Sequence, residues 1–246
     1  SMSEVPPGHE ALVKLGTRGM IRKIEEELKR DQAADQEKKD TLKAMIISLE
    51  GVNAYAGNLA LQALKEANEE KDPQRKAELE KMHQMLLKVP EHPAETLDEA
   101  VQNIMLMHVC LGMESTDDGP MFGRLDQILQ PYFESDISKL SAQEEKEAYI
   151  KHVIDILGCF YFIEASHQIL APDIGNWQNG DSPPNGTITL GGVTPEGEDA
   201  VNDMTYILLK VTELLALNDP NVHARYKPDK NSLAYLKRVC DVNYIT

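Results

Sequence analysis

The chain has 246 residues, and its 25 Lys and Arg residues against 41 Asp and Glu residues give a formal net charge of -16. A field of this sign repels phosphate backbones and anionic lipid surfaces, so we expect neither a nucleic-acid-binding nor a membrane-binding protein. No apolar run approaches the ~20 residues that cross a bilayer, and the first residues lack the basic and apolar regions of a signal peptide. We therefore expect a soluble, cytoplasmic protein, and we interpret Ser1-Met2 as a cloning remnant.

The three cysteines are widely spaced and odd in number. Cys110, Cys159 and Cys240 each lie among apolar neighbours. This pattern predicts buried thiols in a reducing compartment better than it predicts a disulfide framework.

The first half of the chain has the apolar periodicity of amphipathic helices. Apolar residues recur at steps of three and four over 41–68, which predicts a long helix. Asp72-Pro73 then supplies a cap residue and a proline at the first helical position, so a shorter helix is predicted from there to about Pro90.

Later helices are predicted from their start signals. Thr96 with Glu99, and Ser141 with Glu144, have the spacing of capping boxes. Thr194-Pro195 predicts the start of a further helix, and a last helix is expected to follow Asp229-Lys230-Asn231.

Two segments interrupt this helical pattern, at 112–136 and 171–193. The second ends in Thr187-Ile188-Thr189-Leu190, a β-branched run typical of a strand, and 222–226 predicts another short strand. Helices alternating with short strands indicate an α/β fold that is predominantly helical. No linker divides the chain, so we treat 1–246 as one partial domain.

Two blocks of sequence resemble the pyruvate formate-lyase-like superfamily of glycyl-radical enzymes, in its lyase and dehydratase branch. Residues 123–137 read GRLDQILQPYFESDI, which is similar to a family segment of Gly-Arg-hydrophobic-Asp-Gln and an aromatic triplet. Residues 187–209 read TITLGGVTPEGEDAVNDMTYILL, which is similar to a second family segment. Residues 37–60, 72–82 and 92–114 resemble the outer helices of the family in family order.

The resemblance implies outer helices and part of an α/β barrel at whose centre two loops meet. One loop carries a cysteine in a Gly-Cys-Val-Glu motif, and the other carries the glycyl radical in an Arg-Val-x-Gly-Tyr motif. Neither motif occurs in these 246 residues. Gly158-Cys159 matches the first two residues of the cysteine motif, but Phe160-Tyr161 follows in place of Val-Glu. We therefore expect an internal fragment with no catalytic residue of its own and predict a buried thiol at Cys159.

The resemblance also implies how the parent protein acquires its radical and which partners it has. No cofactor is expected to bind this chain directly. The parent would carry a glycyl radical installed by an S-adenosylmethionine-dependent iron-sulfur activating enzyme. It would act on a small-molecule substrate in the cytoplasm of an anaerobic organism, as a homodimer.

The loop before the first block is the place where the resemblance implies substrate contact. Diol-dehydrating relatives have a His-Ser pair there, and counting back from Gly123 puts Asp118 and Gly119 at those positions, with Ser115 nearby. This difference argues against glycerol or propanediol as the substrate and favours an amine, a cation or a hydroxyl donor. The alternative is an ordinary solvated acidic turn.

Further residues are candidates for supporting the pocket or its loops. Arg124, Asp126 and Gln127 have the chemistry to clamp neighbouring loops by charge-assisted hydrogen bonds, with direct substrate contact as the alternative. Thr189 lies on the predicted strand. Arg225, on the second strand, either faces the interior or pairs with an acidic helix.

Gly191-Gly192 allows positive φ and a close approach of the backbone to a ligand or loop. The alternative for this pair is a plain strand-to-helix turn capped by Thr194. The seven histidines have no metal-ligand spacing, so no zinc site is expected.

Two hypotheses of different classes follow. In the first, the chain is part of a glycyl-radical lyase or dehydratase that acts by thiyl-radical hydrogen abstraction, and the fragment alone is inactive. In the second, it is a standalone acidic helical scaffold or binding module that keeps the fold without the chemistry.

Overall fold

The computed structural model describes residues 7–31, 35–114, 121–166 and 186–246. Their contacts separate the chain into two compact units, which we describe one at a time. The helical unit comprises residues 10–95 and 102–107, and the sheet unit comprises 1–9, 96–101 and 108–246. Helix α4 (Leu97–Glu114) supplies residues to both.

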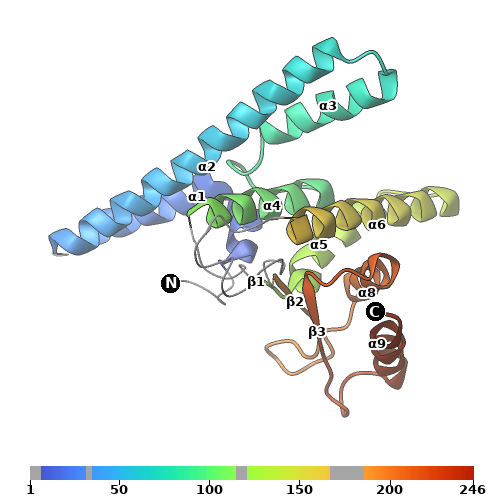
Figure 1. Cartoon of the computed structure of the whole chain (residues 1–246). Helices are drawn as coiled ribbons and strands as arrows, with labels where there is room; N and C mark the ends of the chain where they lie inside the picture. The colour runs from blue at the N-terminus through green and yellow to red at the C-terminus, as the bar shows by residue number, and fades with distance from the viewer. Residues whose placement is uncertain (1–6, 32–34, 115–120, 167–185) are drawn as a thin grey trace, which may run out of the picture. The chain divides into compact units, whose positions relative to one another are not determined.

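The helical unit contains helices α1 (His9–Arg30), α2 (Gln36–Glu69) and α3 (Pro73–Leu86). Helices α2 and α3 form an antiparallel hairpin, as Figure 1 shows. The buried face of α2 is made of small residues, which allow a close approach to the larger Leu79 and Leu86 of α3. These small residues are Val52, Ala56, Ala60, Ala63 and Ala67.

The predicted start of the second hairpin helix is confirmed. The Asp72 carboxylate accepts hydrogen bonds from Gln74 N (2.8 Å) and Arg75 N (3.4 Å), and Pro73 occupies the first turn. The cap and the proline together therefore set where α3 begins.

Helix α1 contains a break at Gly16. Gly16 has φ +64 and ψ 167, and a Cβ there would collide with the backbone of Glu91. The amides of Thr17 and Arg18 donate to the carbonyls of Pro90 (2.9 Å) and Glu91 (3.1 Å). The break thus lets the 90–91 segment approach α1, where only glycine fits.

The sheet unit is built on three parallel strands in the order β1-β2-β3. They are β1 (Met121–Gly123), β2 (Thr187–Gly191) and β3 (Asn221–Arg225). Among its described residues the unit has four further helices, and α8 and α9 lie beside each other in Figure 1. They are α5 (Leu125–Ile137), α6 (Gln143–Ser166), α8 (Asp203–Leu215) and α9 (Leu233–Ile245). The predicted α/β, predominantly helical fold class is confirmed.

Phe122 forms the centre of an aromatic cluster in the core of the sheet unit. Its ring centroid lies 5.9 Å from that of His9, 4.9 Å from His108 and 4.8 Å from Phe160. His9 is only 2% exposed, and burial lowers the pKa of His9 to about 4. The core therefore contains an imidazole that is neutral at physiological pH.

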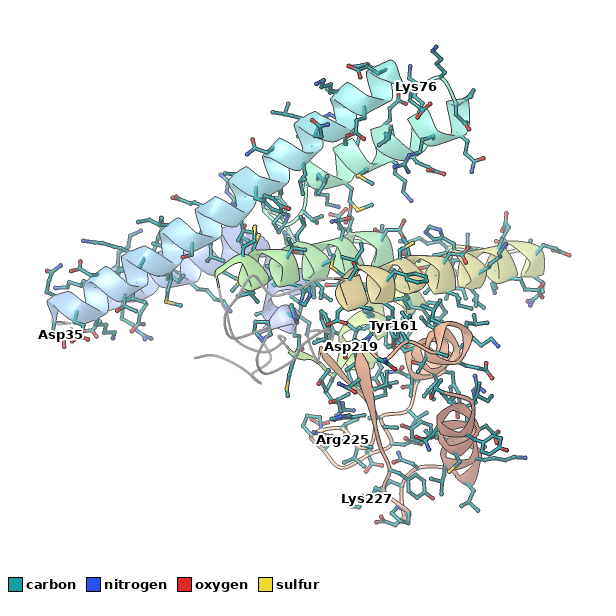
Figure 2. The ribbon with its side chains drawn as sticks, viewed as in Figure 1. Asp35, Lys76, Tyr161, Asp219, Arg225 and Lys227 are labelled. Atoms are coloured by element: carbon teal, nitrogen blue, oxygen red, sulfur yellow. The ribbon has the colours of Figure 1, made fainter. Side chains whose placement is uncertain are left out.

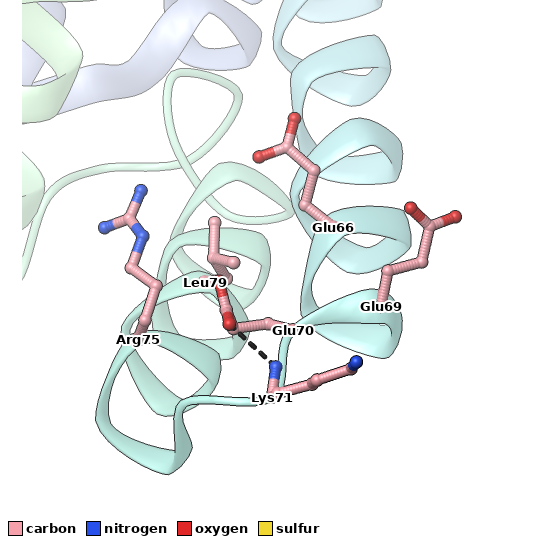
Figure 3. A pocket seen from close by; sticks show the side chains of 6 residues that line it. All are labelled: Glu66, Glu69, Glu70, Lys71, Arg75 and Leu79. Atoms are coloured by element: carbon pink, nitrogen blue, oxygen red, sulfur yellow. Dashed lines mark hydrogen bonds between the residues drawn. The ribbon is translucent and has the colours of Figure 1, made fainter.

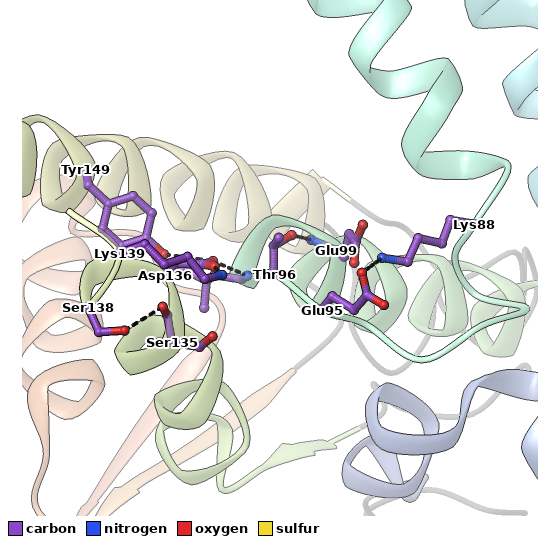
Figure 4. Close-up of polar contacts among 10 residues, drawn as sticks. Lys88, Glu95, Thr96, Glu99, Ser135, Asp136, Ser138, Lys139 and Tyr149 are labelled. Carbon is purple, nitrogen blue, oxygen red and sulfur yellow. Dashed lines mark hydrogen bonds and ion pairs between the residues drawn. The ribbon is translucent and has the colours of Figure 1, made fainter.

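The beginning of α4 is held by a carboxylate from α5. Asp136 accepts hydrogen bonds from Leu97 N (2.8 Å) and Tyr149 OH (3.3 Å) and pairs with Lys139, as Figure 4 shows. A carboxylate at a helix amino end satisfies a free amide and complements the helix dipole. Thr96 Oγ1 also accepts from Glu99 N (3.2 Å), so the predicted Thr96 cap is confirmed.

One predicted helix start is wrong, and one predicted capping box has a different acceptor. Helix α8 begins at Asp203 rather than near Thr194, because Asn202 and Thr205 form the capping box. Residues 194–199 instead form a turn in which Thr194 N donates to Glu198 O (2.9 Å). Before α6, the carboxylate that accepts from Ser141 N (3.2 Å) belongs to Glu145 and not to Glu144.

The prediction of buried cysteines is also wrong. Cys159 and Cys240 are exposed and Cys110 is half-buried. On α6 the buried positions are Val153, Leu157, Phe160 and Tyr161, and Cys159 lies two residues after Leu157. That offset turns a helical residue by about 200°, so the apolar neighbours of Cys159 in sequence are not its neighbours in space.

Candidate functional site

The carboxyl ends of the three strands form the candidate site. Strands β2 and β3 pair in register from Thr187↔Asn221 to Gly191↔Arg225, and β1 runs parallel to β2, so the carboxyl ends of all three strands point towards one edge of the sheet. In open α/β sheets this edge is where ligands and functional loops gather. The chain leaves β1 here into Arg124, and it leaves β2 here into Gly192.

Arg124 binds the turn that follows β2. Its Nη2 donates to Gly191 O (2.6 Å) and its Nη1 to Val193 O (3.1 Å). A planar guanidinium spans two carbonyls in this way, which a lysine ammonium cannot do with the same geometry. The side chain of Arg124 therefore joins residues that are 67 and 69 positions apart in the sequence.

Asp126 binds the same turn from the amide side. Its Oδ2 accepts hydrogen bonds from Gly191 N (2.7 Å) and Thr205 Oγ1 (2.7 Å), and its Oδ1 accepts from Gln127 N (2.8 Å). Asp126 is fully buried, and this burial raises the pKa of its carboxyl, against the hydrogen bonds and the Arg124 charge that lower it. The donors around the carboxylate are those that a buried anion requires.

Gln127 extends this arrangement to the turn before α8. Its Nε2 donates to Ala200 O (2.7 Å), and one turn further on Gln130 Oε1 accepts from Met204 N (3.0 Å). We call the side chains of Arg124, Asp126 and Gln127 the clamp. The clamp fastens the start of α5 to residues 191–205.

Gly191 is enclosed on three sides. Arg124 binds its carbonyl, Asp126 binds its amide, and a Cβ built on Gly191 would collide with the Tyr235 hydroxyl group. Gly191 also has φ +63, in the left-handed region that favours glycine. Both the backbone conformation and the space therefore require glycine here.

Gly192 is constrained in a similar way, with φ +75 and a built Cβ only 2.8 Å from Arg225 Cβ. Its carbonyl accepts hydrogen bonds from Asn231 Nδ2 (2.7 Å) and Ala200 N (3.1 Å). The interpretation of Gly191-Gly192 as a strand-to-helix turn capped by Thr194 is wrong, because the helix begins at Asp203.

The other sequence candidates fall at different places. Thr189 is half-buried in the middle of β2, opposite His223 of β3. Arg225 is exposed at the end of β3, and in Figure 2 it lies at the opposite end of that strand from Asp219. Within the described ranges Arg225 forms no ion pair. Ser115, Asp118 and Gly119 lie outside the described residues.

Sequence reasoning missed four side chains of this site: Asn202, Thr205, Asn231 and Tyr235. Asn202 and Thr205 have the spacing of a capping box, which was available as a signal. Asn231 and Tyr235 gave no signal, because a buried polar residue and a buried aromatic residue in a short helix have no characteristic pattern. Burial raises the pKa of the Tyr235 hydroxyl to about 12, and nearby Asp126 adds to this shift.

A second polar site, in the helical unit, is a pocket of about 340 Å³ at the turn from α2 to α3, shown in Figure 3. The Glu70 carboxylate there accepts from the amides of Lys71 (2.7 Å) and Asp72 (2.9 Å) and so serves the turn itself. The residues lining the pocket are Glu66, Glu69, Glu70, Lys71, Arg75 and Leu79. Among the described residues no group of His, Cys, Asp and Glu side chains has the arrangement of a metal site.

Residues 1–244 match the family described as pyruvate formate lyase-like. The chain belongs to this family. Its glycyl-radical lyase and dehydratase members include the isethionate sulfite-lyase of Nitratidesulfovibrio vulgaris, which is 34% identical over 192 residues. That match covers 77% of this chain and 22% of the relative.

Two solved structures of glycyl-radical dehydratases resemble this pyruvate formate lyase-like chain. The glycerol-bound B12-independent glycerol dehydratase of Clostridium butyricum has a TM-score of 0.86 at 25% identity, covering 97% of this chain and 29% of that protein. Hydroxyproline dehydratase of Clostridioides difficile, with trans-4-hydroxy-L-proline bound, has a TM-score of 0.84 at 26% identity, covering 98% and 31%. The chain thus spans less than a third of the length of these relatives.

No helix within the described ranges is both long enough and apolar enough to cross a membrane.

Proposed function

We propose that this chain is part of a glycyl-radical lyase or dehydratase that acts on a small polar substrate. The observation that carries the proposal is the match of residues 1–244 to the pyruvate formate lyase-like family, together with similarity to lyases and dehydratases over most of the chain. In the complete enzyme a thiyl radical would take a hydrogen atom from the substrate, and elimination or bond cleavage would follow. The radical would come from a glycyl radical installed by an S-adenosylmethionine-dependent iron-sulfur activating enzyme.

Within that enzyme, this chain would provide outer helices and part of the barrel wall. We propose that the clamp is loop support, because both terminal nitrogens of Arg124 donate to backbone carbonyls and the Asp126 carboxylate is surrounded by donors of the protein itself. The Asp126 carboxylate, which already accepts three hydrogen bonds, has little capacity left for a substrate. Thr189, Gly191, Gly192 and Arg225 are proposed to support the same edge.

Substrate contact is proposed for Ser115, Asp118 and Gly119, which directly precede β1. An acidic side chain at Asp118 would accept a hydrogen bond from an amine or a hydroxyl group. The complete enzyme is further proposed to be a cytoplasmic homodimer in an anaerobic organism.

The experiment begins with the reading frame that encodes Thr246. A frame that continues into Gly-Cys-x-Glu and then Arg-Val-x-Gly-Tyr supports the enzyme, and a stop codon directly after Thr246 supports a scaffold that keeps only the fold. The product of a continuing frame is activated without oxygen and assayed against isethionate, trans-4-hydroxy-L-proline and glycerol, the compounds in the names of similar proteins.

Variants of the complete enzyme then separate substrate contact from loop support. Asp118→Asn is expected to raise KM for the substrate while leaving the melting temperature unchanged. Arg124→Lys is expected to lower the melting temperature while leaving KM nearly unchanged. The reverse pattern would contradict the proposed roles.

A further inference from the structure

Glu164, near the end of α6, is a buried acid that the clamp does not involve. Its side chain has no exposed surface, and neither carboxylate oxygen has a hydrogen-bond partner of good geometry. A buried carboxylate without donors is costly when ionised, so such groups are normally paired or protonated. The environment of Glu164 therefore requires an explanation.

The surroundings of Glu164 lie at the amino end of the sheet, opposite the clamp. A Cβ built on Gly186, the residue before β2, would collide with the Glu164 carboxylate, so the two are in direct contact. Asn221 N, at the start of β3, donates to Gly186 O (2.7 Å). The carboxylate thus lies against the backbone that joins the starts of β2 and β3.

The charged and titratable groups around Glu164 disfavour its ionisation. Asp219, directly before β3 and only 2% exposed, adds a negative charge, and the fully buried Tyr161 lies one turn earlier on α6. The Gly186 amide has the smallest effect and lowers the pKa of Glu164. Across the described part of the chain no basic side chain pairs with Glu164.

We propose that Glu164 is a proton-operated latch between α6 and the amino end of the sheet. When protonated, its carboxyl group stays against Gly186. When it ionises, the repulsion from Asp219 and the loss of hydration drive it out of this contact, and the starts of β2 and β3 open locally.

The sign of the pH effect follows from the shift of the titration. Burial, followed by the Asp219 charge, raises the pKa of Glu164 from 4.5 to about 7. Because the closed state holds its proton more tightly than the open state, closure is favoured at low pH and weakens as pH rises from 4.5 through about 7. Local opening at this end of the sheet should therefore increase across neutral pH.

Hydrogen exchange at the Asn221 amide of the whole chain measures this opening. After correction for the intrinsic exchange rate, the protection factor is expected to fall roughly tenfold between about pH 6 and about pH 8. In Glu164→Gln the protection factor should change by less than about twofold over the same pH range, because glutamine does not titrate. Glu144→Gln, an exposed change on the same helix, should behave as the unchanged protein.

A second variant keeps the latch testable if Glu164→Gln does not fold. Asp219→Asn removes the repulsion. The protection factor should then fall by less, and the fall should be complete at a lower pH. The latch is overturned if either variant keeps the full pH dependence. It is also overturned if a potassium or magnesium salt, rather than a lower pH, restores protection, because the site would then hold a cation.

Discussion

The carboxylate of Asp126 accepts a hydrogen bond from the backbone amide of Gly191 at 2.7 Å, and the Thr205 hydroxyl binds the same oxygen at 2.7 Å. One buried side chain at the start of α5 thus fixes both the end of β2 and the first turn of α8.

Asp126→Ala should therefore destabilise the sheet unit by about 2–3 kcal/mol, because it leaves the buried Gly191 amide without an acceptor. Chemical denaturation of the chain measures the change. Asp155→Ala, an exposed aspartate change on α6, is the matched control and should alter stability by less than about 0.5 kcal/mol. Equal effects of the two variants would contradict the role of Asp126.

Gly191→Ala tests the enclosed turn. We expect a loss of about 2–4 kcal/mol, since alanine disfavours positive φ and its Cβ would collide with the Tyr235 ring. Gly197→Ala is the comparison: Gly197 has φ +86 but open space around it, so only the backbone cost of about 1 kcal/mol should appear. If Gly191→Ala lost no more stability than Gly197→Ala, the close contact between Gly191 and Tyr235 would be absent.

Tyr235→Phe removes a buried hydroxyl group that has no hydrogen-bond partner in the described structure. Its loss should change the free energy of unfolding by less than about 1 kcal/mol, because no bond is broken and a little space is gained near Gly191. Thermal melts of the two proteins provide the comparison. A loss above about 2 kcal/mol would reveal a partner for this hydroxyl group.

His9 predicts a sensitivity to acid. Its pKa of about 4 in the folded protein lies below the value of 6.5 expected when unfolded, so only the unfolded state gains a proton between these pH values. Stability should fall as pH drops from 6.5 towards 4, by about 3 kcal/mol in all from this residue.

Urea denaturation at a series of pH values tests this prediction. His9→Leu should flatten the dependence, whereas His92→Leu, at an exposed position of the helical unit, should leave it unchanged. An unchanged slope in His9→Leu would contradict a neutral, buried imidazole.

The parts of the fold that were predictable from sequence are those governed by local physics. The hairpin helix after Asp72-Pro73 and the strand at Thr187 follow from capping and β-branched residues close to them in sequence. The misplaced start at Thr194 shows the limit of this reasoning. A Thr-Pro-Glu sequence has the same local preference in a turn as in a helix, and the contact of Asn202 with Thr205 decides the outcome.

The candidate site was predictable only in part, for a related reason. Arg124, Asp126 and Gln127 attracted attention by their chemistry, but their partners at Gly191, Val193 and Ala200 are more than 60 positions away in sequence. The exposure of Cys159 could not be predicted from sequence either, because it depends on which face of α6 packs against the core. Contacts set by the tertiary fold leave no short-range pattern in a single sequence.

Electron paramagnetic resonance tests the central claim most directly. The 246-residue chain and the product of its complete reading frame are each treated anaerobically with the activating enzyme and S-adenosylmethionine. The account predicts a glycyl-radical doublet in the complete product and none in the 246-residue chain. A doublet from the 246-residue chain, or silence from a complete product that contains both family motifs, would contradict it.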